Sequence, residues 1–460
     1  MNRVAAVVLL GGWTGLASAA QDAGPWRLDA AIDSPELVSL GGSYRVRYET
    51  LNHPYRAGAT GSDEILVGRL LLNARVTLRS LYVNLEFEDS RQQLADSGSA
   101  LGTDSVNTLE PLQMLAGMRF DDVLSRGARL DVSAGRMTID VGGRRLVSRN
   151  NFRNTINAYT GVHALWKSAD GFEARAFYVE PVQRKPSDLA SLLDNDSELD
   201  SESSDVSLWG LFGATPEVFG DVKAEAYFYG LRTRDHVGIP AADRDIYTPG
   251  FRLYRTPVAQ SWDFETEAAY QFGTSRQTTA ATDTRDLQHR AGFFHGEIGY
   301  TWSGKLLPRV ELFYDYASGD DDPSDNENNR FDTLYGSRSF DYGPTGIYGA
   351  LARANLNSPG LRLEAKPLPN LSGRVGYRAV WLASSRDQYT TARLQDRTGN
   401  SGDFVGHQLD AQIQYTLLPG NLVLEFGGAY LAHGEFLETA PDAPNEGDTT
   451  YIYASATATF

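Results

Sequence analysis

The chain has 460 residues and a formal net charge of −17, from 42 Lys and Arg against 59 Asp and Glu side chains. This acidic balance argues against nucleic-acid binding, because sequence-independent nucleic-acid binders need a basic face. The absence of cysteine from the sequence excludes disulfide scaffolds, thiol catalysis and thiolate metal sites.

Residues 1–20 have the three-part layout of a secretory signal peptide. Arg3 supplies the positive charge, residues 4–16 form a short apolar core, and Ala17-Ser18-Ala19 fits the small-residue cleavage pattern. The apolar run is too short for a membrane anchor. The alternative to a signal peptide is a buried N-terminal helix. Beyond it, no run reaches the roughly 18 apolar residues of a membrane-spanning helix. The sequence therefore predicts export through a cleaved signal peptide.

Alternating polar and apolar residues predict β-strands along the rest of the chain. In residues 43–49 (SYRVRYE), Tyr and Val side chains share one face and charged side chains share the other. Residues 262–268, 408–415 and 421–426 repeat this pattern. A period of two gives each strand one apolar and one polar face.

The connections between these strands are either short or long. The short ones include Arg79-Ser80-Leu81, Ala169-Asp170-Gly171, Thr215 to Gly220, Leu306-Leu307-Pro308, Pro367 to Leu371 and Leu418-Pro419-Gly420. The long ones cover residues 51–63, 91–111, 139–154, 183–204, 233–246, 277–286, 321–358, 387–401 and 435–446. Strands of about ten residues joined in this way are typical of transmembrane β-barrels, whereas a soluble sandwich has neighbouring turns of similar length.

The number of long loops sets the number of strands. Nineteen runs resemble strands, but a barrel with both chain ends in the periplasm needs an even number. We assign the surplus run, residues 346–357, to a folded loop or short helix. The nine long loops then predict an all-β fold, an 18-stranded antiparallel transmembrane β-barrel with short periplasmic turns and long extracellular loops. Residues 21–460 form this single domain, and barrels of this size hold an aqueous channel.

The C-terminal residues 451–460 add a further signal. Their even positions are all apolar and the last residue is Phe460. Such a strand resembles the recognition strand that outer-membrane barrels present to the barrel-assembly machinery. Closure of a barrel satisfies every backbone polar group in lipid. The sequence therefore places the protein in the Gram-negative outer membrane, in contact with lipid and lipopolysaccharide.

Inward-facing side chains, assigned from the phase of each strand, are grouped by charge. A basic sector on strands 1–2 and 14–15 flanks the seam where the barrel closes, and an acidic sector on strands 11–13 lies farther round. The basic ones are Arg45, Arg47, Arg69, Arg75, Arg79, Arg175, Arg362, Lys366, Arg374 and Arg378. The acidic ones are Glu86, Glu88, Asp263, Glu265, Glu267, Glu297, Glu311 and Asp315. A pore with such sectors carries a transverse field that orients and filters charged solutes. The alternative is that these charges pair across strands, as in any polar lumen.

Arginine supplies 37 of the 42 positive charges. It offers carboxylates and phosphates a planar, bidentate fork, although genomic composition alone could produce the preference. The densest cluster is Arg144, Arg145, Arg149 and Arg153, within ten residues of one loop. A charge run is usually a solvated face. Because this cluster lies among acidic loops, we interpret it as part of a folded-in constriction.

Four motifs, in order along the chain, resemble the bacterial alginate export family. They are Gly135-Arg136-Met137, residues 141–161 (VGGRRLVSRNNFRNTINAYTG), residues 314–320 (YDYASGD) and residues 331–336 (FDTLYG). The resemblance covers essentially the whole mature chain. It implies an eighteen-stranded outer-membrane porin, and the best known member passes a uronic-acid polysaccharide outward through an arginine-lined channel.

The same resemblance implies that Arg45 or Arg47, Arg69 or Arg75, Arg136, Arg149 or Arg153, and Arg362 line an anion-selective channel. With the inward arginines and the loop cluster, the predicted pore-lining set is Arg45, Arg47, Arg69, Arg75, Arg136, Arg144, Arg145, Arg149, Arg153, Arg362, Arg374 and Arg378. One departure concerns Leu418-Pro419-Gly420. The alginate exporter has a long periplasmic turn at this place, before its seventeenth strand. The polymer substrate therefore stays open.

The predicted function is an outer-membrane channel that passes anionic solutes, or an anionic polysaccharide such as alginate, by passive diffusion. The alternative is a surface-display or adhesion barrel with a closed lumen, whose long acidic loops bind partners. Residues 183–205, 320–327 and 435–448 carry −15 of the net charge of −17, so the acidity belongs to the loops. A monomer is favoured, and no nucleic-acid partner is expected.

Catalytic and metal-binding motifs are weak in this sequence. Gly-x-Ser-x-Gly, His-Glu-x-x-His and P-loop motifs are absent, and the inward-facing His163 and His295 have no adjacent nucleophile pattern. We predict no enzyme, although catalytic groups can converge from distant strands in an outer-membrane hydrolase. Asp320, Asp322 and Asp325 offer oxygen ligands for calcium. They lack the EF-hand spacing, so a solvated acidic loop is the favoured interpretation, and no cofactor is expected beyond this candidate structural calcium.

Overall fold

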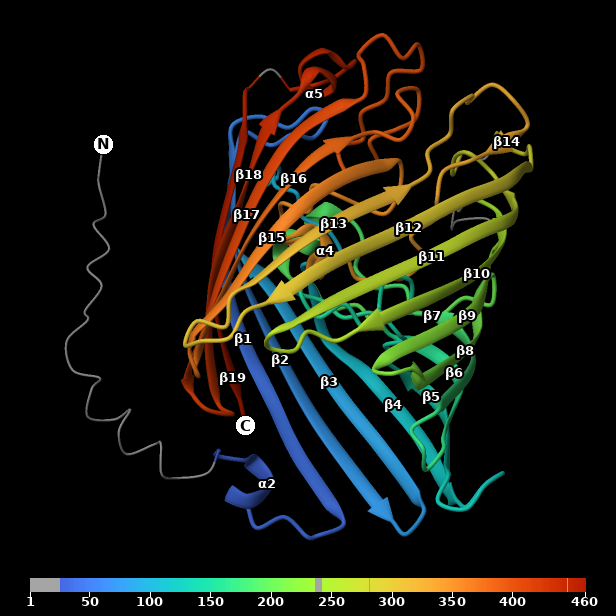
Figure 1. The fold of residues 1–460 in the computed structure, drawn as a ribbon, viewed down its shortest axis with the longest axis vertical. Helices are drawn as coiled ribbons and strands as arrows, with labels where there is room; N and C mark the ends of the chain where they lie inside the picture. Colours follow the sequence, from blue (N-terminus) through green and yellow to red (C-terminus); the bar gives the residue numbers. More distant parts are fainter. Residues whose placement is uncertain (1–24, 236–241, 281, 445) are drawn as a thin grey trace, which may run out of the picture.

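The computed structural model describes residues 25–235, 242–280, 282–444 and 446–460. Within these residues, eighteen antiparallel strands close into a barrel, which confirms the fold predicted from the sequence (Figure 1). The first and last strands, β1 (Val38–Asn52) and β19 (Thr449–Thr459), pair with each other and form the seam. The predicted signal peptide lies outside the described residues.

The remaining strands of the wall follow in chain order. They are β2 (Ser62–Leu78), β3 (Leu81–Gln93), β4 (Asn107–Asp121), β5 (Arg129–Met137), β6 (Tyr159–Lys167), β7 (Glu173–Pro181), β8 (Val206–Phe219), β9 (Val222–Thr233), β10 (Arg244–Arg255), β11 (Ser261–Ser275), β12 (Leu287–Thr301), β13 (Arg309–Ala317), β15 (Leu356–Leu368), β16 (Leu371–Trp381), β17 (Phe404–Leu418) and β18 (Leu422–His433). Apart from the wall, the chain forms β14 (Glu327–Asn328), α2 (Leu28–Ala31), α3 (Leu189–Asp194), α4 (Ser339–Tyr342) and α5 (Glu435–Thr439). None of the helices formed by the described residues is long and apolar enough to cross a membrane.

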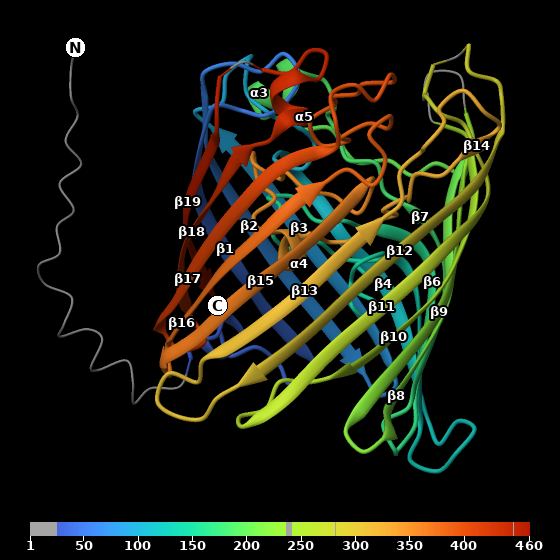
Figure 2. The ribbon, with the colours of Figure 1, turned by 45° about the horizontal axis from the view of Figure 1, so that its top comes forward.

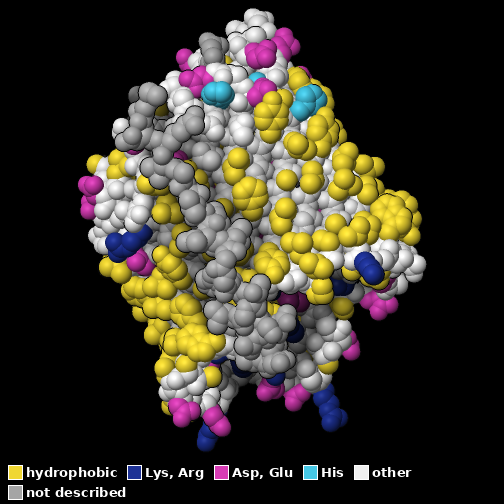
Figure 3. Space-filling model, turned by 90° about the vertical axis from the view of Figure 1, so that its left-hand side faces the viewer, with side chains coloured by type: hydrophobic (Ala, Val, Ile, Leu, Met, Phe, Trp, Pro, Cys, Tyr) yellow, Lys and Arg dark blue, Asp and Glu magenta, His cyan; other side chains and the backbone are white. Residues whose placement is uncertain are grey.

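The two faces of each strand have opposite character. On β17, Ile413 points outward and is 52% exposed, whereas its neighbour Gln414 lines a cavity inside the barrel. Figure 3 shows hydrophobic side chains over much of the outer wall, with acidic side chains gathered toward the upper and lower margins of this face. The alternation therefore places an apolar surface against lipid and polar groups inside the barrel.

The strands are joined by short turns at one end and long loops at the other, as the sequence predicts (Figure 2). The predicted turn from Thr215 to Gly220 starts too early, because β8 continues through an irregular register to Phe219. Residues 346–355, assigned to a loop from strand parity, do form a loop, and β15 begins at Leu356. The long-loop end is the extracellular one in barrels of this type.

Two long loops fold into the barrel and pack on each other. Residues 138–158 join β5 to β6, and residues 318–355 join β13 to β15. The backbone N–H of Tyr335 in the second loop donates to the carbonyl of Leu146 in the first, at 2.9 Å. Buried apolar residues of both loops share one core with the wall, and α4 lies within the ring of strands (Figures 1 and 2). We call these two loops the inner loop layer.

Ile413→Arg should destabilise the barrel, because an arginine on the lipid-facing side costs up to about 2–4 kcal/mol near the bilayer midplane. The matched control is Gln414→Arg, which places the same side chain on the neighbouring lumenal position and should change stability far less. Urea titration of folding into lipid vesicles measures both effects. Equal losses for the two variants would contradict this assignment of the faces.

Candidate functional site

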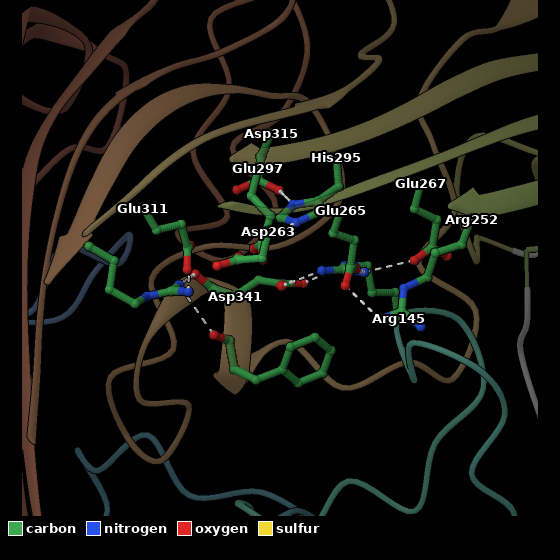
Figure 4. Close-up of polar contacts among 12 residues, drawn as sticks. Arg145, Arg252, Asp263, Glu265, Glu267, His295, Glu297, Glu311, Asp315 and Asp341 are labelled. Carbon is green, nitrogen blue, oxygen red and sulfur yellow. Dashed lines mark hydrogen bonds and ion pairs between the residues drawn. The ribbon is translucent and has the colours of Figure 1, made fainter. Parts of the chain in front are cut away.

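Arg145, a buried side chain of the first inner loop, connects three acidic residues (Figure 4). Its guanidinium forms ion pairs with Glu265 and Glu267 on β11 and with Asp341 on α4. The distances are 2.8 Å to Oε2 of Glu267 and 2.9 Å to Oδ1 of Asp341. Arg145 therefore joins the barrel wall to the second inner loop.

Asp341 receives a second cation from its own loop. Arg353, which is 1% exposed, forms an ion pair with the other carboxylate oxygen of Asp341. Burial by itself raises the pKa of the Asp341 carboxyl, but Arg145 and Arg353 outweigh burial and hold that pKa far below its usual range. The carboxylate is therefore ionised at physiological pH and anchors the inner loop layer.

Two predicted pore-lining arginines of the wall also hold this region in place. Arg378 on β16 donates to the backbone carbonyl of Asp341 at 2.6 Å and pairs with Asp315 at 3.2 Å. Arg362 on β15 pairs with Glu311 on β13 at 2.9 Å. Both side chains face inward, but their guanidiniums are already bonded to acidic and backbone groups of the protein.

The acidic sector is neutralised inside the barrel. Each of the six acids predicted on the three neighbouring strands β11, β12 and β13 has a basic partner. The pairs are Arg309 with Asp263, Glu297 and Glu311, Arg252 with Glu265, Arg145 with Glu267, and His295 with Asp315. Arg362 and Arg378 are further partners of Glu311 and Asp315, so six basic side chains face these six acids. This is the outcome expected from the alternative of charge pairing across strands, and the acids provide little unneutralised negative charge.

The predicted pore-lining set omits three cations of this network, Arg252, Arg309 and Arg353. The period-two phase of β10 and β13 places Arg252 and Arg309 opposite inward-facing partners, so strand alternation was sufficient to find both. Arg353 lies in a loop without periodicity. No signal in the sequence marks its role.

The predicted basic residues at the seam bind backbone carbonyls. Arg45 on β1 donates to the carbonyls of Asn151 at 2.9 Å and of Arg153 at 2.6 Å. Arg69 on β2 donates to the same two carbonyls at 3.2 and 3.0 Å. These contacts fasten the first inner loop to the seam.

The other predicted arginines of the first inner loop and its surroundings are mostly paired as well. The pairs are Arg47 with Glu49 (2.7 Å), Arg136 with Glu202 (2.8 Å), Arg149 with Glu86 (2.6 Å) and Arg153 with Asp104 (3.8 Å). Arg144 is exposed, and its guanidinium lies 5.2 Å from the ring centre of Phe340. The loop cluster is thus folded in, as predicted, and most of its charge is used to hold the loop.

Arg75 and Arg374, like Arg45, Arg69 and Arg144, form no ion pair with any described carboxylate. Arg75 lies 4.0 Å from the ring centre of Tyr82. Arg374 lines a cavity of about 430 Å³ close to the short turns, together with Lys366 and Glu364. We call this the turn-side cavity.

A second cavity, of about 310 Å³, lies at the long-loop end. Its charged lining residues are Arg153, Arg184, Arg338 and Arg353. Residues 333–336 of the second inner loop form part of its wall. We call this the loop-side cavity.

The three calcium candidates lie in the second inner loop and make separate contacts. The backbone N–H of Asp320 donates to Asp387 at 2.9 Å, and burial together with Asp387 raises the pKa of Asp320 to about 6. Asp322 and Asp325 accept hydrogen bonds from backbone N–H groups within their own loop. The described residues contain no group of three or more acidic or histidine side chains arranged to hold a metal ion.

Solved structures with the same fold are outer-membrane proteins. They include OccK8 (OprE) of Pseudomonas aeruginosa, with 12% identity, a TM-score of 0.58 and coverage of 92% of this chain and 98% of that chain. OpdQ of Pseudomonas aeruginosa (13% identity, TM-score 0.57) and OccAB1 of Acinetobacter baumannii (13%, 0.56) each cover 92% of this chain and 97% of their own. At these identities the likeness shows the fold alone. A search of curated proteins finds no match.

The family model described as alginate export matches residues 36–448. This match spans most of the chain and confirms the resemblance carried by the four sequence motifs. The family and the similar structures are export channels and porins, which are not enzymes. The chain therefore belongs to the alginate export family of outer-membrane channel proteins.

Proposed function

We propose that this outer-membrane channel passes small anionic solutes by passive diffusion. The observation that carries the proposal is the position of the basic side chains without a described carboxylate partner. Lys366 and Arg374 line the turn-side cavity, and Arg184 and Arg338 line the loop-side cavity. A solute that enters from either end thus meets unneutralised positive charge, which raises the local concentration of anions.

The acidic side chains of the lumen reduce the positive potential of these cations only weakly. Asp263, Glu265 and Glu267 on β11 all have arginine partners. In the turn-side cavity, Glu364 lies 3.7 Å from Arg309, which also pairs with other acids, so Lys366 and Arg374 face at most one unneutralised carboxylate. Paired charges contribute little net field at a distance, whereas Lys366 and Arg374 keep theirs. The balance therefore favours anions over cations.

The inner loop layer favours small solutes over an extended polysaccharide. Leu146, Phe331 and Tyr348 of its two loops are buried in the core that they share with the wall. The turn between β17 and β18 covers only residues 419–421, so it is too short to act as a periplasmic plug that opens for a polymer. We therefore restrict the proposal to small anions.

In this proposal residues 1–20 are a cleaved signal peptide and residues 21–460 are the single mature domain. The last strand, β19, is presented to the barrel-assembly machinery, and the apolar outer wall contacts lipid and lipopolysaccharide. The chain acts as a monomer. A surface-display barrel with a closed lumen is the competing function, and conductance separates the two.

The double variant Lys366→Gln with Arg374→Gln should lose anion preference. Removing one charge about 4 Å from a permeating ion changes its energy by about 1 kcal/mol in a water-filled lumen, or roughly five-fold in occupancy. Planar bilayers under a potassium chloride gradient give the reversal potential and hence the ratio of chloride to potassium permeability.

The control for this measurement is Arg91→Gln, because Arg91 is an exposed side chain on β3 that points away from the lumen. It should leave the reversal potential unchanged. Cation preference in the unmodified protein would refute the proposal. Negligible conductance combined with loop-dependent partner binding would favour the surface-display barrel.

Asp341→Asn should loosen the inner loop layer and raise the single-channel conductance. The change leaves Arg145 and Arg353 without their shared carboxylate, and breaking a buried ion pair from one side costs about 3–5 kcal/mol. The control is Asp322→Asn, since Asp322 is an exposed residue of the same loop whose carboxylate, among the described residues, accepts hydrogen bonds only from Ser324. A conductance equal to that of the unmodified protein would show that the layer does not limit permeation.

A further inference from the structure

The loop-side cavity holds arginine side chains that the fold does not neutralise. Arg338 donates from Nη1 to the carbonyl of Leu351 at 3.0 Å, and no described group accepts from its Nε. Arg184 donates from Nη1 to Oδ1 of Asn157 at 2.9 Å, and its Nε likewise has no described acceptor. Neither guanidinium forms an ion pair with a described carboxylate.

The other two arginines of this cavity have acidic partners. Arg353 is held by Asp341, and Arg153 lies 3.8 Å from Asp104. The contact of Arg153 runs from its Nε and is too long for a hydrogen bond, so Asp104 neutralises this guanidinium only partly. The cavity therefore has a surplus of positive charge.

This surplus is costly in the absence of an anion. Burial, together with the charge of Arg153, lowers the pKa of Arg184 and outweighs the carboxylates of Asp104, Glu88 and Asp200. The same two causes outweigh Asp104 and lower the pKa of Arg338 to about 10. Both side chains are still charged at neutral pH. A buried charge without a partner is strongly unfavourable. An anion that enters the cavity therefore forms favourable ion pairs with these two guanidiniums.

The rest of the cavity wall is mainly apolar. Ala158, Pro181 and Val182 line one part, and Leu334 and the ring of Tyr335 belong to the second inner loop. A volume of about 310 Å³ is near the lower end of the range for small-molecule sites, about 300–1,000 Å³. A molecule with one ring fits this volume, whereas a chain of sugars does not.

We propose that the loop-side cavity is a binding site for a small organic acid, with its carboxylate on Arg184 and Arg338 and its apolar body against Val182, Leu334 and Tyr335. This deepens the proposed function, on which it rests, by giving the permeating anion a defined binding position at the inner loop layer. An inorganic anion satisfies the charge but leaves the apolar wall in contact with water. The site therefore distinguishes organic acids from simple ions.

The test uses the full-length protein in detergent and benzoate as the probe, with binding measured by isothermal titration calorimetry. We expect saturable binding of benzoate and at least about ten-fold weaker binding of acetate, which lacks the apolar body. Arg338→Gln and Arg184→Gln should each weaken benzoate binding about ten-fold or more, since a hydrogen bond to a charged group is lost. Arg91→Gln, on the outer face, should leave it unchanged.

A second variant keeps both arginines and removes the space. Val182→Trp fills the apolar part of the cavity, so benzoate binding should fall while acetate binding changes little. Heat-dependent migration in detergent gels shows whether each variant still forms a barrel. Benzoate binding that is equal in the unmodified protein, Arg338→Gln and Val182→Trp would overturn the site, as would equal binding of acetate and benzoate.

The two proposals fail in different measurements. If the unmodified channel shows no anion preference, the proposed function is wrong, but calorimetric binding of benzoate still supports the site. Anion preference without benzoate binding overturns the site alone.

Discussion

Arg145 and Asp341 meet at 2.9 Å inside the barrel, and each belongs to a different loop. Neither charge could be buried alone, because desolvation of an ion costs several kcal/mol unless a partner compensates it. Arg145 also pairs with Glu265 and Glu267 of the wall, and Asp341 also pairs with Arg353. The position of both loops, and with it the shape of the lumen, depends on this contact.

The lumen uses arginine for two separate purposes. Arg309 and Arg252 neutralise wall acids, and Arg45 and Arg69 hold loop backbone. Among the cations without a described carboxylate partner, Lys366 and Arg374 line the turn-side cavity and Arg184 and Arg338 line the loop-side cavity. Counting basic residues therefore overstates how many face a solute, since the functional charge is what remains after the structural pairs are formed.

The wall was predictable because strand alternation has a fixed period and each long loop marks one hairpin of strands. Strand parity also resolved the surplus run at residues 346–357, of which residues 346–355 form a loop. The inward direction of Arg362 and Arg378 followed from the same periodicity. The turn near Thr215 was misplaced, because β8 keeps pairing with β9 through an irregular register. Some loop ends also differ by several residues, since the loop predicted at 387–401 covers residues 382–403.

The partners of the inward charges could not be predicted in the same way. Arg145, Arg353 and Asp341 lie in loops, where no repeat fixes the direction of a side chain. Arg338 and Arg184 come together from segments about 150 residues apart in sequence, and only the folded loops bring them to one cavity. The loop-side cavity therefore could not be found by reading the strands, and the predicted pore-lining set contains neither residue.

The contacts of the inner loop layer also connect it to the seam of the barrel. Glu49 on β1 accepts a hydrogen bond from the backbone of Ile347, and Tyr451 on β19 donates to the same carboxylate. These groups meet only when the first and last strands are already paired. The seam and the inner loop layer therefore support each other, and a change that opens the seam also loosens the layer that narrows the lumen.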